Sequence, residues 1–312
     1  MRPKPSAEYG SNGMKTPFAS FAGLSDSTQG ILWMLLTTIL FVAMDGIAKA
    51  LTQSYPVPQV TWARYAFHAL ALAVLFRRRL PALMRSKRLG LQIVRSSLLL
   101  SATTMSFFAL RVMPLADVVA IWALTPILVT ALSVPLLGEH VGPRRWAGVA
   151  AGFVGALIII RPGLGLMQTA AVLPATVAVI LALYHLATRA LSGIDTPLTT
   201  IVYTVSVGLV VSTGAIPFFW VTPDASAWVF MIALGLLGAT AHFSLIKSFE
   251  VATAATVIPY TYTNLIWATL AGFVFFGDLP DVWTVIGAGV IVVSGLYIFH
   301  REHRQAKSES GQ

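Results

Sequence analysis

Long apolar stretches, separated by short polar or proline-containing breaks, run through almost the whole chain. A helix needs about 20 mostly apolar residues to cross the hydrocarbon core of a bilayer. Ten stretches come close to or exceed that length: 30–51, 58–76, 92–111, 115–137, 143–160, 168–190, 197–216, 226–249, 252–276 and 281–299. They lack the alternation of apolar and polar residues that the strands of a membrane β-barrel show. The pattern predicts an all-α polytopic membrane protein with ten transmembrane helices.

The two ends of the chain are polar and are expected to lie outside the bundle. Residues 1–29 are rich in Ser and Gly and predict a flexible tail, and residues 301–312 predict a second, shorter tail. A signal peptide is the competing interpretation of the start. It is disfavoured because the first apolar run is too long and no small-residue cleavage site follows it.

The chain also contains an internal repeat, at an offset of 139 residues. Arg111–Arg161 overlays Glu250–His300 without a gap. This predicts two five-helix halves, 30–161 and 168–300. Because five is odd, the second half is expected to enter the membrane in the opposite orientation. Inverted repeats of this kind recur in secondary transporters, where two similar bundles exchange inward and outward conformations.

Charged residues are scarce, and their location predicts an orientation. Of the 312 residues, 56% are hydrophobic and only 11% are charged, whereas a soluble domain has about 25% charged residues. This argues against a soluble enzyme and a nucleic-acid-binding domain, despite the net charge of +9. Basic residues gather at 77–88 and 301–307. Since Lys and Arg concentrate on cytoplasmic loops, we expect a multi-pass protein of the cell inner membrane with both termini in the cytoplasm.

The repeated stretch carries a resemblance to a known family. The first copy runs from Ala116 to Gly138-Glu139 and precedes a glycine-rich helix, and the second copy has Gly277-Asp278 at the matching place. With five plus five helices, this pattern resembles the EamA-type transporters of the drug/metabolite transporter superfamily. The resemblance covers nearly the whole chain and implies secondary transport of a metabolite. Its diffuse motifs do not identify the substrate.

Charged and titratable residues inside the expected spans are the first candidates for a substrate site. A charge at the centre of a bilayer costs about 2.5 kcal/mol or more, so it usually faces a cavity or a partner. Asp45 and Arg64 lie on consecutive antiparallel helices and could neutralise each other. His68 and His185 lie on the second and sixth expected helices; a satisfied buried histidine is the alternative interpretation of His68. Asp45 could also pair with Lys49 four residues later, although Lys49 is expected to reach the membrane interface.

Hydroxyl groups, aromatic rings and an amide add to the candidate pocket. The residues concerned are Trp62, Ser101, Trp122, Tyr184, Tyr260 and Asn264. Close helix packing is the alternative role for the small hydroxyl residues, and ordinary packing is the alternative for the rings. Pro126, in the middle of the fourth span, frees a backbone carbonyl and permits a bend. We expect it to serve gating.

Together these features predict a secondary transporter that moves a small organic metabolite by alternating access. The chain has no GxxxxGK[ST], HExxH or GxSxG motif, which argues against ATP-driven pumping, a metalloprotease and a hydrolase. An amino acid, a riboflavin-like vitamin and a nucleoside-like compound all fit, and the aromatic residues favour a planar cargo. No cofactor or metal is expected, whereas protons and lipids are candidate partners. A polytopic membrane enzyme and a channel are the alternatives, and the oligomeric state is open.

Overall fold

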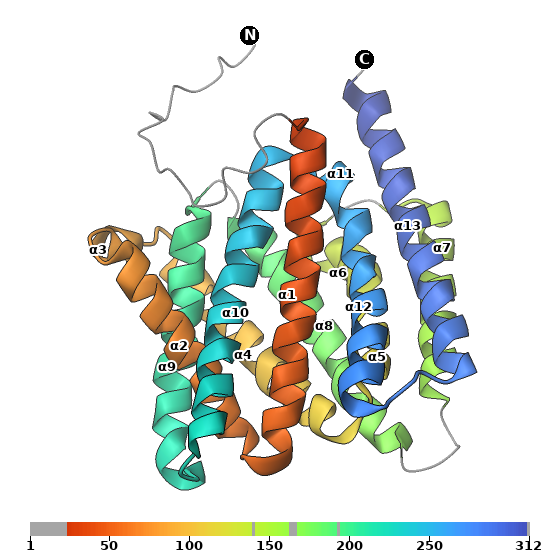
Figure 1. Cartoon of the computed structure of the whole chain (residues 1–312). Helices are drawn as coiled ribbons and strands as arrows, with labels where there is room; N and C mark the ends of the chain where they lie inside the picture. Colours follow the sequence, from red (N-terminus) through yellow and green to blue (C-terminus); the bar gives the residue numbers. More distant parts are fainter. Residues whose placement is uncertain (1–23, 139–140, 162–166, 192–193, 311–312) are drawn as a thin grey trace.

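The computed structural model describes residues 24–138, 141–161, 167–191 and 194–310. Side chains are described within these ranges except at 167–169, 254–255 and 302–310. All regular structure in the described ranges is helical, as the apolar pattern predicts. The long helices run alongside one another and form one bundle (Figure 1).

The elements follow the expected order. The first half contains α1 (Asp26–Ser54), α2 (Val57–Phe76), α3 (Leu80–Leu83), α4 (Leu89–Val112), α5 (Leu115–Trp122), α6 (Thr125–Leu137) and α7 (Pro143–Ile160). The second half contains α8 (Met167–Leu191), α9 (Pro197–Phe219), α10 (Ala225–Val251), α11 (Ala254–Val257), η2 (Ile258–Tyr262), α12 (Thr263–Ala271), η3 (Gly272–Phe276) and α13 (Val282–Ser310).

Within the described ranges, eight helical segments are long and apolar enough to cross a membrane, and α5 with α6 counts as one of them. The expected helix at 58–76 is present as the 20-residue α2. The stretch expected as one helix at 252–276 is divided into α11, η2, α12 and η3. Both segments pack against other helices of the bundle, α2 against α9 and α10 and α12 against α1. The chain is therefore an all-helical, multi-pass membrane protein.

The first and last helices of the chain extend into the segments expected as tails. α1 begins at Asp26, and the Ser25 side chain caps it by accepting a hydrogen bond from the Thr28 backbone N–H. Such a cap satisfies a backbone donor that the first turn leaves free. α13 continues to Ser310 instead of ending near residue 299. Apolar length therefore marks the part of a helix that can lie in lipid, while the helix itself continues into polar sequence.

Two of the expected helices are broken at equivalent positions of the repeat. In the first half, α5 ends at Trp122 and α6 begins at Thr125. Pro126 lies in the first turn of α6, where its missing N–H costs no hydrogen bond. In the second half, the 3₁₀ segment η2 precedes α12. The two runs end alike, at Gly138 with φ 69° and Gly277 with φ 70°, a conformation that favours glycine.

Glycine residues allow the helices to approach each other closely. A Cβ atom on Gly208 of α9 would lie 2.3 Å from the ring of Tyr65 on α2. A Cβ atom on Gly287 of α13 would lie 2.5 Å from the backbone oxygen of Gly155 on α7. Close van der Waals packing of this kind drives helix association in lipid. In Figure 1, α7 and α13 form one edge of the bundle, and α2 and α9 lie at the opposite edge.

Large apolar side chains cover the outside of the bundle. Val74, Val210, Phe218 and Phe275 are 68%, 71%, 82% and 76% exposed. Exposed large apolar side chains occur on all the long helices, from Ile39 of α1 to Val285 of α13, and apolar surface on this scale marks a membrane or protein contact. The outer surface therefore suits a lipid environment, and the buried polar side chains are gathered inside.

Candidate substrate-binding site

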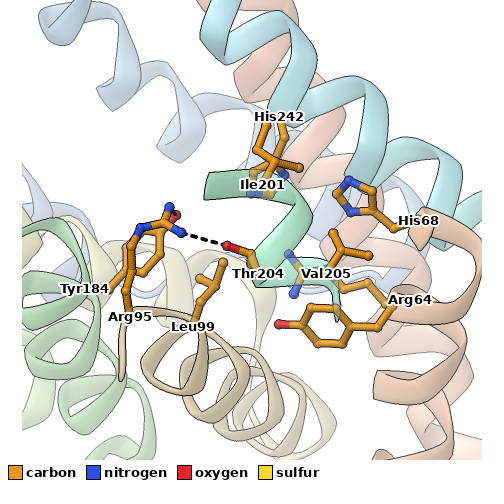
Figure 2. Close-up of a pocket in the computed structure, with 10 residues that line it drawn as sticks. Arg64, His68, Arg95, Leu99, Tyr184, Ile201, Thr204, Val205 and His242 are labelled. Atoms are coloured by element: carbon orange, nitrogen blue, oxygen red, sulfur yellow. Dashed lines mark hydrogen bonds between the residues drawn. The ribbon is translucent and has the colours of Figure 1, made fainter. Parts of the chain in front are cut away.

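A small cavity of about 10 Å³ lies between helices of the two halves (Figure 2). It is bounded by α2 and α4 from the first half and by α8, α9 and α10 from the second. Its lining residues are Arg64, Tyr65, His68, Arg95, Leu99, Tyr184, Ile201, Thr204, Val205 and His242. Cationic, aromatic and aliphatic groups thus share one small space.

Arg95 of α4 is held in place by hydroxyl groups of the second half. Its Nε donates to Thr188 Oγ1 at 2.6 Å, its Nη1 to Thr204 Oγ1 at 2.7 Å and its Nη2 to the Tyr184 hydroxyl at 2.5 Å. The guanidinium carbon also lies 4.4 Å from the centre of the Tyr184 ring, within the range of a cation–π interaction. Arg95 and Tyr184 therefore form a fixed unit on one side of the cavity, as Figure 2 shows.

Arg64 of α2 lies on the other side of the cavity (Figure 2). It is 5% exposed, and its Nη1 donates to Thr103 Oγ1 of α4. Its Nε is buried with no hydrogen-bond partner among the described residues. Asp45 of α1 is also buried and interacts electrostatically with Arg64, but no hydrogen bond or ion pair joins these two described side chains. Arg64 therefore keeps donors available.

Two histidines complete this end of the cavity. The ring centres of His68 on α2 and His242 on α10 are 5.6 Å apart. His242 Nδ1 donates to the Gly238 carbonyl at 2.9 Å, which fixes the ring. His68 is 4% exposed, and its Nε2 is buried without a partner in the described part of the chain. A bound molecule could hydrogen-bond to this nitrogen.

The structure brings together only some of the residues singled out from the sequence. Arg64, His68 and Tyr184 line the cavity, and Asp45 is buried close to it. Trp62 instead lies near the start of α2, where its Nε1 donates to Thr213 at 3.2 Å. Three further candidates are exposed: Ser101, His185 and Tyr260.

The remaining candidates lie at the two helix breaks. Trp122 ends α5, Pro126 lies at the start of α6, and Asn264 lies at the start of α12. Thr125 and Asn264 are equivalent in the repeat, and α5 packs against α12. Trp122 Nε1, Thr125 Oγ1 and Asn264 Oδ1 are buried and lack partners among the residues described. The breaks therefore carry polar groups of their own, separate from the ten lining residues.

Lys49 neither pairs with Asp45 nor extends away from the protein as expected. Its Nζ lies 3.5 Å from Asp278 Oδ2, and it donates to the Met113 carbonyl at 2.7 Å. These contacts join the end of α1 to the α4–α5 connection and to the segment before α13. Lys49 is 9% exposed, so it is buried by protein instead of reaching the interface. Glu139, the repeat counterpart of Asp278, lies outside the described residues.

Sequence reasoning missed Arg95, Tyr65 and Thr204. Ser101, the candidate residue of the third expected helix, lies on an exposed face of α4. The buried stripe contains Arg95, Leu99 and Thr103. One residue turns a helix by about 100°, so adjacent stripes face different neighbours. Arg95 itself was the signal, because a charge inside an apolar span points to the stripe that faces the protein.

Comparisons with known proteins agree with this architecture. The EamA-like transporter family matches the chain twice, over residues 28–161 and 168–299. A riboflavin transporter of Rhizobium johnstonii is 32% identical over 299 residues, which cover 91% of this chain and 95% of that protein. An S-adenosylmethionine uptake transporter of Rickettsia prowazekii is 23% identical over 281 residues, covering 90% of this chain and 96% of that protein.

A protein of known crystal structure has a similar fold. Its TM-score is 0.62 at 18% sequence identity, over 89% of this chain and 99% of that one. This likeness concerns the fold alone. The two family matches, together with the relatives, confirm the resemblance seen in the repeated stretch, and the chain belongs to the EamA-like transporter family.

Proposed function

We propose that the chain is a secondary transporter that carries a small organic metabolite across the cell inner membrane by alternating access. The observation that carries this proposal is the polar cavity lined by helices of both halves. A site between two repeats can face either side of a membrane when one repeat tilts against the other. The family and the names of the relatives concern transporters and not enzymes, which disfavours a membrane enzyme.

The proposed topology has ten spans in two inverted halves, 30–161 and 168–300, with both termini in the cytoplasm. The arginine-rich connection between α2 and α4 supports this orientation, because basic residues favour the cytoplasmic face. The ends of α1 and α7 and the start of α13 then face outward. The breaks in the fourth and ninth spans provide places where such helices can bend.

We assign the cargo to metabolites with a planar ring system, with riboflavin as the first candidate and S-adenosylmethionine as the second. The relatives carry these names, and the Tyr65 and Tyr184 rings in the cavity can pack against a flat molecule. Pockets for drug-sized ligands hold about 300–1,000 Å³, whereas the cavity between these side chains has a volume of about 10 Å³, which is room for about one water molecule. A cargo of that size therefore requires the lining side chains or helices to move apart.

Uptake by proteoliposomes tests the proposal. Purified protein in liposomes is offered labelled riboflavin, S-adenosylmethionine and a panel of amino acids and nucleosides, without ATP. We expect saturable uptake of at least one planar compound and faster uptake when unlabelled compound is preloaded. Arms with and without a pH gradient separate proton coupling from exchange. If no compound in the panel enters faster than it enters protein-free liposomes, the transport proposal fails.

A further inference from the structure

Unpartnered donors at one end of the cavity indicate which part of the cargo binds there. Arg64 has five N–H donors, and its bond to Thr103 uses one of them. Arg64 Nε and, one helical turn later, His68 Nε2 are buried without hydrogen-bond partners among the described residues. Buried polar groups are nearly always paired in folded proteins. Two such atoms on one helix face of one cavity therefore point to a ligand group.

We propose that Arg64 and His68 recognise a cargo through a pair of neighbouring oxygen acceptors. A carboxylate offers two adjacent oxygens to the planar fork of a guanidinium. The two carbonyl oxygens of a ring imide lie on either side of an N–H, so Arg64 would donate to one of them and His68 to the other. The proposal rests on the proposed transport function and adds the chemical group that this end of the site selects.

The charges around the cavity favour such a group. Arg64 and Arg95 both line it, and none of the ten described lining residues is acidic. Asp45 lies close enough to Arg64 to interact with its charge, but the two described side chains form no ion pair. The donors of Arg95 are directed to hydroxyl groups on α8 and α9. The charged residues that line the cavity are thus two arginines, and the nitrogens without a partner among the described residues belong to Arg64 and His68.

Helix α10 approaches Arg64 and His68 with a glycine. A Cβ atom at Gly238 would lie 3.8 Å from the unpartnered Arg64 Nε and 3.8 Å from Nδ1 of the His68 ring. Its closest neighbour would be Met44 Sδ at 3.4 Å, which is ordinary van der Waals contact. Gly238→Ala should therefore fold normally and narrow the space beside the free donors. This variant changes the site without changing any charge.

Matched ring compounds test the proposal in a binding assay that needs no transport. Lumichrome has a three-ring system with two imide carbonyls, and phenazine is a similar three-ring system without them. Nicotinate and 3-methylpyridine form the carboxylate pair. Binding is measured as the increase in melting temperature of the purified, detergent-solubilised protein, followed by circular dichroism. The lumichrome and nicotinate arms distinguish an imide edge from a carboxylate.

We expect lumichrome, nicotinate or both to raise the melting temperature by about 3 °C or more, and phenazine and 3-methylpyridine to have little effect. Arg64→Gln and Gly238→Ala should each remove most of the increase. Arg64→Lys should keep part of it, because it retains the charge without the fork. Arg111→Gln, which removes an exposed arginine outside the cavity, should keep the increase.

Three results would overturn the proposal. The first is that each control compound raises the melting temperature as much as its partner, phenazine as much as lumichrome and 3-methylpyridine as much as nicotinate. The second is a full increase in the folded Arg64→Gln protein, and the third is no increase with either lumichrome or nicotinate. Arg64→Lys keeps the test valid if Arg64→Gln does not fold. Transport is judged separately. Arg64-dependent binding without uptake of any panel compound would reject the transport proposal alone, and uptake unaffected by Arg64→Gln would reject this inference alone.

Discussion

Arg95 and Arg64 share one cavity but are held in different ways. Arg95 donates to three hydroxyl groups on α8 and α9, which fixes its orientation and joins α4 to the second half. For Arg64, the described hydrogen-bond partner is Thr103 on the neighbouring α4. Arg95 is therefore suited to hold the wall of the site in place, while Arg64 is suited to contact the cargo.

Replacing Arg95 by lysine separates charge from geometry. The three nitrogens of a guanidinium donate in different directions, and a single ammonium group cannot donate to all three hydroxyl groups on the two helices. A hydrogen bond to a charged group contributes about 1.5–3 kcal/mol, so we expect Arg95→Lys to lower the initial uptake rate about tenfold or more. Arg111→Lys, at an exposed position, is the control and should retain the wild-type rate. Wild-type uptake by Arg95→Lys liposomes would contradict this role.

Asp195, which lies outside the cavity, is expected to make the stability of the folded protein depend on pH. It lies in the connection between α8 and α9. Partial burial raises the pKa of its carboxyl group, but hydrogen bonds from Ser86, Gln92 and the Lys87 backbone N–H outweigh this effect and hold the pKa below its usual 3.8. A carboxylate with a depressed pKa stabilises the folded state above its unfolded pKa of about 3.9, and this contribution is lost as pH falls through the folded pKa.

We therefore expect Asp195→Asn to melt at a lower temperature than the wild-type protein at pH 6. The difference should shrink as pH falls below about 4, because the wild-type carboxyl group becomes protonated there. Melting curves of the two proteins between pH 3 and pH 6 measure this. A difference that stays constant across that range would show that the carboxylate charge does not stabilise the loop.

At the scale of elements, the apolar pattern located the helices better than it located their breaks. Pro126 predicted a bend in the fourth span, and α5 and α6 separate directly before it. The stretch 252–276 was expected as one helix, although it contains Pro259. A proline removes a backbone donor and clashes with the preceding turn, and the chain adopts a 3₁₀ turn there. Hydropathy does not record this change, because it averages the apolar character of the residues and carries no information on backbone hydrogen bonds.

The contact between α7 and α13 depends on glycine at the point where the backbones meet. A Cβ atom on Gly287 would lie 2.5 Å from the Gly155 carbonyl oxygen, so Gly287→Ala must push the two helices apart. Overpacking of this kind costs about 1–3 kcal/mol. We expect a lower melting temperature for Gly287→Ala. Gly289→Ala is the control, because a Cβ atom there meets nothing within 4 Å. Equal melting temperatures for the two variants would contradict the close contact.

For the whole molecule, sequence predicted the membrane class and the family, and three of its candidate residues, Arg64, His68 and Tyr184, line the cavity. The sequence did not show which helices pack against each other, and that packing determines which residues line the cavity. Arg95 acquires its role from Thr188 and Thr204, about a hundred residues later in the chain. Hydrophobic periodicity identifies apolar faces, but in lipid most faces are apolar, so the protein-facing side of each helix is weakly marked.

Polar contacts between the two halves close the end of the bundle where α1 finishes. Lys49 pairs with Asp278 at 3.5 Å, and Gln59 Nε2 donates to the Val221 carbonyl at 2.7 Å. Both contacts join the first half to the second. If the transporter alternates between two conformations, opening this end requires the helices that carry these residues to separate. The ion pair between Lys49 and Asp278 is then part of a gate that breaks in each transport cycle.

A reversible cross-link between positions 49 and 278 tests this gate. The chain has no cysteine, so Lys49→Cys with Asp278→Cys introduces the only two thiols. Joining them with a bis-methanethiosulfonate spacer should stop uptake, because the end of α1 can no longer move from the segment before α13. Cleavage by a reductant should restore whatever uptake the double variant has before cross-linking. Each single variant treated in the same way controls for modification alone.

The second ion pair at the same end provides the matched control. Arg161, at the end of α7, pairs with Asp281, directly before α13. Since α7 and α13 are packed backbone to backbone at Gly155 and Gly287, we expect them to move as one unit. Cross-linking Arg161→Cys to Asp281→Cys should therefore leave uptake unchanged. If both cross-links stop uptake, α7 and α13 also move apart during transport. If neither cross-link stops uptake, the contact of Lys49 with Asp278 is a permanent link and not a gate.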